Sequence, residues 1–349
     1  PSPLGGEGWG EGLLLEPGAH TRVSYAAAGV DLTAAEENVR RIAGHVRSTH
    51  GPAVLGDFGA FAGLLHLSGV RDPVLVASTD GVGTKLLLGI ELGRYRVLGS
   101  DLVNLSVNDI LTTGARPLFF LDYIGAHALE NDVIEELVEG MAEACRANGC
   151  ALLGGETAQL ADLYAPGHFD LAGTVVGVVE RSAMIDSSRV QVGDSLWGLP
   201  STGLHTNGFS LARKLIAQLD LGEDPQGRLG QPLGDALLVP HPSYLQQVHQ
   251  ARPHLKAIAH ITGGGLPGNL PRVLADHVSA ELYWGSWPVP PIFEVLQELG
   301  HLPFNEMLRV FNLGLGMVLV TPPSATLPAP ALPIGRVVER GTERVRVAR

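Results

Sequence analysis

Residues 78–86 read S-T-D-G-V-G-T-K-L, and residues 99–110 read G-S-D-L-V-N-L-S-V-N-D-I. The first stretch follows the apolar run 73–77, which is typical of a buried strand. Such a strand would carry Asp80 to its C-terminal end, where open α/β sheets bind their ligands. The arrangement predicts an α/β fold with a ligand site at the end of this strand.

Glycines, a hydroxyl group and a cation follow directly after Asp80. Gly81 and Gly83 lack a Cβ atom, so the main chain can approach a ligand closely, and Thr84 and Lys85 add the polar groups. The segment is not a Walker P-loop, because that pattern places a glycine directly before the lysine and Thr84 intervenes here. We predict that these residues contact a cofactor in some other geometry.

The second stretch predicts a helix that starts near Ser100. At about 100° per residue, Asp101, Asn104 and Asn108 share one stripe, with Asp109 on its flank. Polar stripes usually meet water, but solvated faces carry Lys, Arg and Glu, and no Lys or Arg occurs from residue 97 to 115. Short oxygen-bearing side chains suit Mg²⁺, which often shares its shell with nucleotide phosphates. We therefore predict a metal and phosphate site.

Length, composition and charge limit the class of protein. The chain has 349 residues, enough for two domains, and its composition is 45% hydrophobic and 17% charged. A net charge of −12 argues against nucleic acid and anionic membranes as partners, but not against a small anionic ligand in a local pocket. No stretch approaches the roughly 18 apolar residues that a membrane span needs.

Cysteine usage and the N-terminal sequence bear on the compartment. Two cysteines, Cys145 and Cys150, do not make a disulfide framework, and no Cys and His residues have zinc-ligand spacing. The first residues lack the basic region of a signal peptide. These features predict a reducing, cytoplasmic setting.

Helix and strand patterns alternate along the chain and predict an α/β (α+β layered) protein of two domains. We expect a flexible extension at 1–23, an N-terminal domain at 24–182 and a C-terminal domain at 183–349, because the segment 181–195 is polar and rich in turn residues. The Pro-rich run 322–333 predicts a rigid connector. Strands are predicted at 73–79, 117–124, 150–153, 169–179, 257–262, 278–284, 314–321 and 334–338.

Four glycine-rich loops could hold phosphate groups, at 56–63, 81–85, 201–208 and 262–268. A single loop of this kind is usually only a tight turn. Four of them favour a phosphate-rich ligand, and the last two lead into predicted helices whose N-termini can bind an anion. The candidate contacts in these two loops are Thr206, Asn207, Gly208, Gly263, Gly264 and Gly265.

Two further side chains are candidates for the site. Glu156 follows a short apolar strand and two glycines, as Asp80 follows its own strand, so it either lies exposed at a turn or completes an oxygen cage for Mg²⁺ with Asp80, Asp101 and Asp109. A lone loop histidine such as His205 is usually solvated. At a helix start and followed by Thr-Asn-Gly, it could be a general acid or base, or donate to a phosphate.

Several of these motifs, in this order, resemble the phosphoribosylformylglycinamidine cyclo-ligases, also called aminoimidazole ribonucleotide (AIR) synthetases. The similarity covers roughly residues 24 to 338. The matching stretches are S-Y-A-A-A-G-V-D (24–31), S-T-D-G-V-G-T-K-L (78–86), D-L-V-N-L-S-V-N-D-I (101–110), G-A-R-P-L-F-F-L-D-Y (114–123), G-G-E-T-A (154–158), D-L-A-G (170–173), H-T-N-G-F-S (205–210), H-I-T-G-G-G (260–265) and F-N-L-G-L-G-M (311–317).

The resemblance implies a homodimer formed through the N-terminal sheet and an ATP- and Mg²⁺-dependent reaction of purine biosynthesis. ATP phosphorylates the formyl amide oxygen of formylglycinamidine ribonucleotide. The neighbouring amidine nitrogen then attacks, and ADP and phosphate leave. On this basis His205, Lys85 and Asp109 are the candidate catalytic residues, and catalysis would consist mainly of positioning and charge stabilisation.

The chain departs from the family pattern at several positions. Ala26 and Ala27 stand where a lysine and an aspartate are common, Asp57 and Ala60 replace usual glycines, and residues 159–161 read Q-L-A where Glu-Met-Pro is frequent. The replacements at Asp57 and Ala60 weaken the assignment of phosphate contacts to the first glycine-rich loop, and no basic contact is assigned at Ala26 and Ala27.

Related functions remain as alternatives. Selenophosphate synthetase would require a reactive residue in the N-terminal half, and residues 1–144 contain no cysteine. Thiamine-monophosphate kinase would lack H-T-N-G-F-S together with P-L-F-F-L-D-Y, and a hydrogenase-maturation relative would end in a cysteine tail. A non-catalytic nucleotide-binding subunit of an amidotransferase complex would not need the acidic residues, Lys85 and His205 together.

Overall fold

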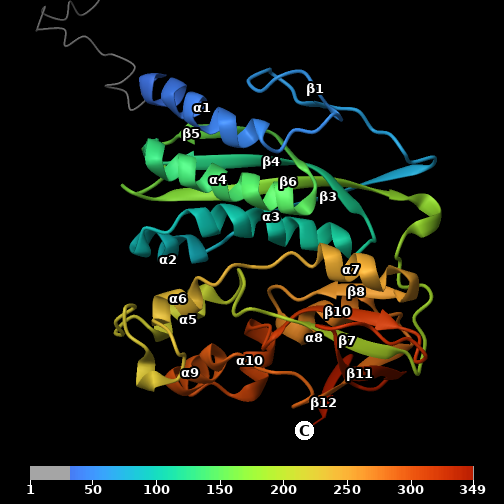
Figure 1. The fold of residues 1–349 in the computed structure, drawn as a ribbon. Coiled ribbons are helices and arrows are strands. Elements are labelled where there is room, and N and C mark those ends of the chain that lie inside the picture. The colour runs from blue at the N-terminus through green and yellow to red at the C-terminus, as the bar shows by residue number, and fades with distance from the viewer. Residues whose placement is uncertain (1–31, 349) are drawn as a thin grey trace, which may run out of the picture.

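A computed structural model describes residues 32–348 as two layered halves, one above the other in Figure 1. The N-terminal half contains a four-stranded sheet and the C-terminal half a six-stranded sheet. The predicted extension at 1–23 and the substituted positions Ala26 and Ala27 lie outside the described residues. The mixed helices and sheets confirm the predicted α+β layered fold.

The N-terminal sheet has the strand order β3-β6-β4-β5. β4 and β5 are parallel, whereas β6 is antiparallel to both of its neighbours. A two-stranded hairpin, β1 and β2, lies apart from this sheet. The elements of this half are α1 (Leu32–Arg47), β1 (Val54–Leu55), β2 (Leu64–Leu65), β3 (Pro73–Gly81), α2 (Lys85–Leu92), α3 (Arg96–Leu111), β4 (Arg116–Ala126), α4 (Asn131–Asn148), β5 (Ala151–Gln159) and β6 (Phe169–Glu180).

β3 is not the fully buried strand that its apolar run predicts. It is an edge strand whose residues alternate between half-buried and exposed, and Leu75 is 64% exposed. Its helix-facing side packs on the core through Val74 and Val76. The prediction that Asp80 closes this strand is correct, and Gly81 is its last residue.

α3 lies between the N-terminal sheet and the C-terminal half (Figure 1) and is buried along most of its length. It starts at Arg96, earlier than the predicted Ser100, and Gly99 explains the difference. A Cβ atom at Gly99 would lie 2.0 Å from the Leu137 carbonyl oxygen of α4, so this glycine allows two helices to touch rather than marking a helix boundary.

The C-terminal sheet has the strand order β12-β9-β11-β7-β10-β8. The interior strand β10, between β7 and β8, is buried at every position. The elements are β7 (Ser195–Pro200), α5 (Phe209–Leu215), α6 (Leu233–Leu237), α7 (Leu245–Ala251), β8 (Ala257–His260), α8 (Gly265–Asn269), β9 (Val278–Tyr283), α9 (Pro291–Gly300), α10 (Phe304–Val310), β10 (Leu315–Thr321), β11 (Leu332–Glu339) and β12 (Val345–Ala348).

The predicted strands all occur, although β5 extends to Gln159 and the run 322–333 includes the first residues of β11. The sequence analysis missed α6, α7 and β12, which are short. Cys145 and Cys150 are both buried and free. Within residues 32–348, every helix is too short or too polar to cross a lipid bilayer.

Candidate functional site

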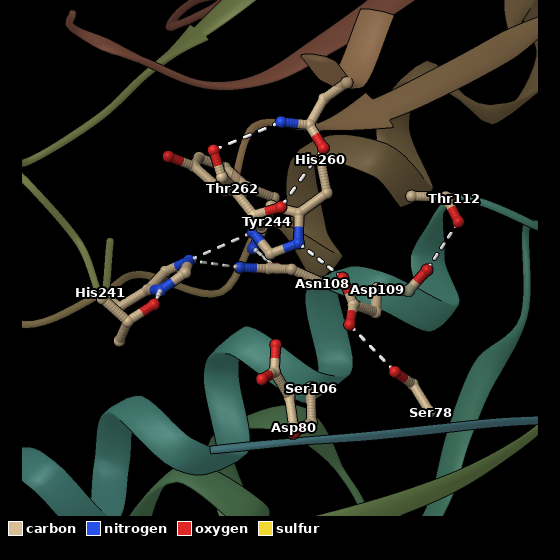
Figure 2. A network of polar contacts seen from close by, with 12 residues as sticks. Ser78, Asp80, Ser106, Asn108, Asp109, Thr112, His241, Tyr244, His260 and Thr262 are labelled. Atoms are coloured by element: carbon tan, nitrogen blue, oxygen red, sulfur yellow. Dashed lines mark hydrogen bonds and ion pairs between the residues drawn. The ribbon is translucent and has the colours of Figure 1, made fainter. Parts of the chain in front are cut away.

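A cavity of about 520 Å³ opens between the two halves of the protein. β3 and α3 form one wall, and β8 with the segment that follows it forms the other. Figure 2 shows Asp80 and Asp109 reaching this region from the N-terminal half and His260 and Thr262 from the C-terminal half. The polar lining residues are Ser78, Asp80, Asp109, Thr112, Thr113, His260, Thr262, Asn269 and Arg272.

Asp80 ends β3, and its Oδ1 accepts a hydrogen bond of 2.7 Å from the Gly81 main-chain N–H. Partial burial raises the pKa of the Asp80 carboxyl, and the nearby Asp109 carboxylate raises it further. Two carboxyl groups therefore face the same space and disfavour each other's ionisation. A bound cation would relieve this repulsion.

Asp109 is held from both sides of the cavity. Its Oδ2 accepts from the Ser78 hydroxyl at 2.9 Å, and its Oδ1 lies 2.8 Å from His260 Nδ1. Burial opposes ionisation, but the His260 and Ser78 contacts outweigh it and keep the pKa of the Asp109 carboxyl below its usual value. Asp109 is therefore an oriented carboxylate at neutral pH.

The donor set fits Mg²⁺ bound together with phosphate. Among residues 32–348 no group of three or more His, Cys, Asp or Glu side chains could hold a metal ion alone. Mg²⁺ is commonly bound through one or two carboxylates, with waters and substrate phosphates filling the remaining positions. Asp80 and Asp109 supply such a pair.

The other two predicted metal ligands do not join this pair. Asp101 is fully buried and its Oδ2 lies 2.5 Å from Lys85 Nζ, while its Oδ1 accepts from the His241 N–H at 2.7 Å. Glu156 lies on β5, which β6 and β4 separate from β3, and it pairs in the sheet with Tyr123. The predicted four-carboxylate cage is therefore not assembled within one chain.

Lys85 likewise does not reach the cavity. Its side chain is fully buried, donates to Asp101 and to the Val239 carbonyl oxygen at 3.1 Å, and lies over the Phe209 ring. The lysine and the aspartate of the two opening motifs thus contact each other within the N-terminal half, and each also binds main chain of the C-terminal half, at Val239 and His241. Their geometry gives them a structural role.

The asparagines of the α3 stripe bind main chain rather than ligand. Asn104 Nδ2 donates to the His241 carbonyl oxygen at 2.9 Å. Asn108 Nδ2 donates to the Pro242 carbonyl oxygen at 2.9 Å, and its Oδ1 accepts from the Tyr244 N–H at 2.9 Å. The expectation that this stripe avoids solvent is confirmed, but its partners are residues 241–244 of the C-terminal half.

His205 is neither solvated nor exposed to the cavity. It is 1% exposed, stacks on His241 with ring centroids 4.1 Å apart, and adopts a φ of 60°. Burial lowers the pKa of His205 well below the ordinary value, and the charges of His260 and Lys85 lower it further. A neutral, covered imidazole of this kind is poorly placed to exchange protons with a substrate.

Three of the predicted glycine-rich loops do converge. A Cβ atom at Gly263 would lie 3.3 Å from Asn207 Oδ1, and one at Gly83 would lie 4.0 Å from the Thr206 carbonyl oxygen. Thr84 Oγ1 lies 3.0 Å from Ser210 Oγ. The loops at 81–85, 201–208 and 262–268 therefore meet beside the cavity, whereas no contact of this kind connects the 56–63 loop to them.

Glycines within these loops have different roles. Gly264 and Gly265 have φ values of 94° and 59°, which disfavour other residues. A Cβ atom at Gly265 would also lie 1.9 Å from the Leu308 carbonyl oxygen. Gly265 is thus required for packing against α10, which leaves Gly263 and Gly264 as the candidates for close contact with a ligand.

Among the polar residues of the cavity that sequence reasoning missed are Ser78, His260 and Arg272. Arg272 Nη1 donates to Asn269 Oδ1 at 3.3 Å, and its charge helps to lower the pKa of Asp109. It is the cation that a phosphate site would need. His260 ends a buried strand, as Asp80 ends β3, and that signal could have identified it. Arg272 follows a proline in a short turn, where no pattern indicates a site.

Asp122 of β4 was also overlooked. It lies in one cross-strand row with Asp80 and Gly173, on the helix-facing side of the sheet. Burial raises the pKa of Asp122 to about 7, and the nearby Glu156 carboxylate raises it further. A Cβ atom at Gly155 would lie 2.2 Å from Asp122 Oδ1, so the glycine directly before Glu156 makes room for this acid.

Each half of the chain matches the model of a known protein family. Residues 59–179 match the model described as "AIR synthase related protein, N-terminal domain". Residues 191–348 match the model described as "AIR synthase related protein, C-terminal domain". Together these matches cover both sheets and every residue of the cavity.

Curated relatives of high identity cover most of the chain. A phosphoribosylformylglycinamidine cyclo-ligase from Myxococcus xanthus (strain DK1622) is 49% identical over 323 residues, which are 90% of this chain and 93% of the relative. One from Nitratidesulfovibrio vulgaris (strain DSM 19637 / Miyazaki F) is 47% identical, and the match covers 86% of this chain and 87% of the relative. One from Sorangium cellulosum (strain So ce56) is 49% identical, and the match covers 85% of this chain and 88% of the relative.

Solved structures with the same fold are more distant in sequence. Thiamine-monophosphate kinase from Stenotrophomonas maltophilia K279a has a TM-score of 0.62 at 22% identity and covers 89% of this chain and 95% of its own. The hydrogenase maturation protein HypE in complex with ATP has a TM-score of 0.62 at 19% identity, and the match covers 87% of this chain and 89% of HypE. At this identity the likeness shows the shared fold.

Proposed function

The chain belongs to the AIR synthase related family, among its phosphoribosylformylglycinamidine cyclo-ligases, and we propose that the cavity between its two halves is the site of ring closure. The protein is an enzyme of purine biosynthesis. It converts formylglycinamidine ribonucleotide to 5-aminoimidazole ribonucleotide with consumption of ATP. One observation carries the location: the cavity brings together two carboxylates of one half and a cation of the other.

The reaction needs an activated oxygen and a positioned nitrogen. The γ-phosphoryl group of ATP is transferred to the formyl amide oxygen, and ADP is released. The amidine nitrogen then bonds to the formyl carbon, the carbon–oxygen bond breaks, and phosphate leaves. Since phosphoryl transfer requires mainly alignment and charge neutralisation, oriented carboxylates and a cation are the groups that matter.

We assign the magnesium site to Asp80 and Asp109. When bound, Mg²⁺ would neutralise phosphate charge during transfer. Asp109 is held in direction by Ser78 and His260, and partial burial together with the Asp109 carboxylate raises the pKa of Asp80, which a bound cation would lower. Asp101 is left out of the assignment because it pairs with Lys85, and Glu156 because β5 lies at the opposite edge of the sheet from β3.

We assign phosphate binding to the C-terminal wall of the cavity. Arg272 supplies positive charge, and Thr262 and Asn269 supply polar groups beside the Gly263-Gly264 turn. Thr206, Asn207 and Gly208 lie next to this turn and extend the same surface.

The predicted homodimer has support from the outer face of the N-terminal sheet. α3 and α4 cover one face of this sheet (Figure 1). The other carries Leu75, Leu121 and Tyr123, which are 64%, 37% and 38% exposed. Apolar side chains on an uncovered sheet face are typical of an interface. The domain boundaries at 182 and 183 and the cytoplasmic location stay predictions.

A direct assay tests the assignment. Purified protein should form 5-aminoimidazole ribonucleotide and ADP in equal amounts from formylglycinamidine ribonucleotide, ATP and Mg²⁺. Product would be followed by chromatography and mass spectrometry. ATP hydrolysis without ring closure, or none in the presence of the ribonucleotide, would contradict the function. A fully active Arg272→Met variant would contradict the phosphate assignment.

A further inference from the structure

His241 lies at the junction of the two halves and contacts residues on both sides of it. Its side chain is fully buried. Its main chain is fixed by α3, because the N–H donates to Asp101 and the carbonyl oxygen accepts from Asn104. Asn104 is fixed in turn, since its Oδ1 accepts from Asn148 Nδ2 at 2.8 Å. The imidazole is therefore held on a rigid support.

The hydrogen position on the His241 ring follows from Asn108. The Asn108 amide has one possible orientation, because its Oδ1 accepts from the Tyr244 N–H and its Nδ2 donates to the Pro242 carbonyl oxygen. The second hydrogen on Asn108 Nδ2 therefore points to His241 Nε2, 3.1 Å away. His241 Nε2 must accept, so the ring hydrogen of the neutral imidazole is on Nδ1, 3.4 Å from Thr206 Oγ1.

His260 lies between His241 and Asp109. Its Nε2 is 3.4 Å from His241 Nε2, and its Nδ1 is 2.8 Å from Asp109 Oδ1 (Figure 2). Since Asn108 and Asp109 are adjacent on α3, these contacts form a closed ring of side chains. The ring starts on α3, crosses to the C-terminal half through two histidines, and returns to α3 at the carboxylate of the cavity.

We propose that His241 is a positioning residue for the ring-closing reaction: it orients His260, and through His260 the Asp109 carboxylate. The proposal rests on the assignment of the reaction to this cavity. His241 itself does not line the cavity. Stacking against His205 sets the plane of its ring, and the contact with Asn108 sets its hydrogen position.

A mere packing role for His241 predicts different behaviour. A buried side chain that only fills space can be replaced by leucine with a loss of stability and no specific loss of turnover. A side chain that orients a reacting group affects kcat, because misplacement of such a group slows the chemical step more than it weakens binding. The two roles are therefore separable by kinetics.

The experiment compares His241→Leu, His241→Gln and the control His249→Leu, whose histidine is exposed on α7. Leucine removes the ring nitrogens, whereas the glutamine oxygen can still accept from Asn108. We expect His241→Leu to lower kcat by about 10-fold or more with KM for both substrates within about 3-fold. His241→Gln should recover part of kcat, and the control should match the parent protein.

An NMR measurement tests the geometry independently of turnover. In the ¹⁵N-labelled parent protein, His241 should show a protonated Nδ1 and an unprotonated Nε2, with the signals assigned by their loss in His241→Gln. The opposite hydrogen position would overturn the proposal, as would a His241→Leu enzyme with unchanged kcat. If the leucine variant does not fold, the NMR result and the kcat of His241→Gln decide. An inactive parent protein would reject the proposed function, and the hydrogen position would still be measurable.

Discussion

Lys85 Nζ lies 2.5 Å from Asp101 Oδ2, and neither side chain is exposed. The two residues belong to the two motifs that identify the family. Their pairing joins the start of α2 to the middle of α3, and Lys85 also donates to Val239 of the C-terminal half. Residues that appear in sequence as a cofactor site thus contribute to the junction that shapes the cavity.

Removing one partner of this pair should destabilise the fold severely. Either Lys85→Met or Asp101→Leu leaves a buried charge without its counter-charge, and we expect each to cost about 3–5 kcal/mol of unfolding free energy. The double variant should lose less unfolding free energy than the two single variants lose together, because no unpaired buried charge remains in it. Urea denaturation of the four proteins measures this.

The control is the exposed ion pair between Arg181 and Asp72, whose side chains are 67% and 60% exposed. Asp72→Asn should change the unfolding free energy by less than about 1 kcal/mol. If the double variant lost as much unfolding free energy as the Lys85→Met and Asp101→Leu variants together, the two side chains would not be coupled, which would contradict their contact in the structure.

Asp80→Asn should raise the Mg²⁺ concentration needed for half-maximal activity. The substitution removes one of the two carboxylates assigned to the ion and leaves Asp109 in place. We expect a shift of about 10-fold or more, since each ligand charge contributes strongly to binding of a hard cation. Activity measured over a range of Mg²⁺ concentrations gives the value.

Asp276→Asn is the matched control, because the Asp276 side chain is fully exposed and does not line the cavity. It should leave the Mg²⁺ dependence unchanged. An Asp80→Asn enzyme with the parent's Mg²⁺ dependence would remove Asp80 from the assigned metal site.

Asp122 should make stability fall with rising pH. Its pKa is about 7 in the folded protein and near 3.9 when unfolded, so between these values the folded state holds a proton that the unfolded state has released. Its contribution to stability is therefore largest below pH 4 and is lost as the pH rises through 7. Asp122→Asn should be more stable than the parent at pH 8, by about 2 kcal/mol after allowance for partial exposure.

The gain from Asp122→Asn should largely vanish at pH 4, where the folded state is protonated and the unfolded state is about half protonated. Chemical denaturation at pH 4, 6 and 8 distinguishes a pH-dependent gain in stability from a general effect of the substitution. An equal gain at all three values would show that the Asp122 carboxyl is not the source.

Two neighbouring glycines should respond differently to alanine. Gly265 combines a φ of 59° with a Cβ position 1.9 Å from the Leu308 carbonyl oxygen, so Gly265→Ala should lower stability by about 2 kcal/mol or more. Gly263 has no positive φ, and its Cβ would lie 3.3 Å from Asn207 Oδ1. Gly263→Ala should fold nearly normally and weaken binding of phosphate-bearing substrates.

Thermal unfolding and the KM values for ATP and the ribonucleotide distinguish the two effects. A stable Gly265→Ala protein would show that α8 can move away from α10. Unchanged KM values in Gly263→Ala would remove this turn from the phosphate site.

The sequence predicted most of the elements because apolar periodicity follows burial. It also predicted that Asp80 and Asp109 belong to one site; both residues line the same cavity, and their role there stays a prediction. It failed where the partner of a polar group lies far along the chain. The polar stripe of α3 was correctly predicted not to face solvent. Its partners at 239–244, however, are more than 130 residues away along the chain, as the contact between Asn108 and Tyr244 illustrates. No local pattern distinguishes an asparagine that binds main chain from one that binds a ligand.

Glu156 shows a second limit. Its motif repeats the strand, glycine and carboxylate order of Asp80, but equivalence in sequence does not fix strand order in the sheet. β5 lies at one edge and β3 at the other. Gly155, directly before Glu156, accommodates Asp122, a requirement that becomes visible only once β4 and β5 are paired.

The outer face of the N-terminal sheet provides the last prediction. Leu121 and Tyr123 are adjacent outward positions on β4, and Leu75 lies on the same face of β3, with β6 between them. If this face joins two copies of the chain, Leu121→Glu would place a charge against its counterpart, and desolvation together with repulsion should dissociate the dimer. Light scattering coupled to gel filtration should give twice the chain mass of 36.7 kDa for the parent and the single mass for the variant. Val39 is also an exposed apolar residue, but it lies on α1, away from this face, so Val39→Glu should remain dimeric. A parent protein that is monomeric at micromolar concentration would reject the interface.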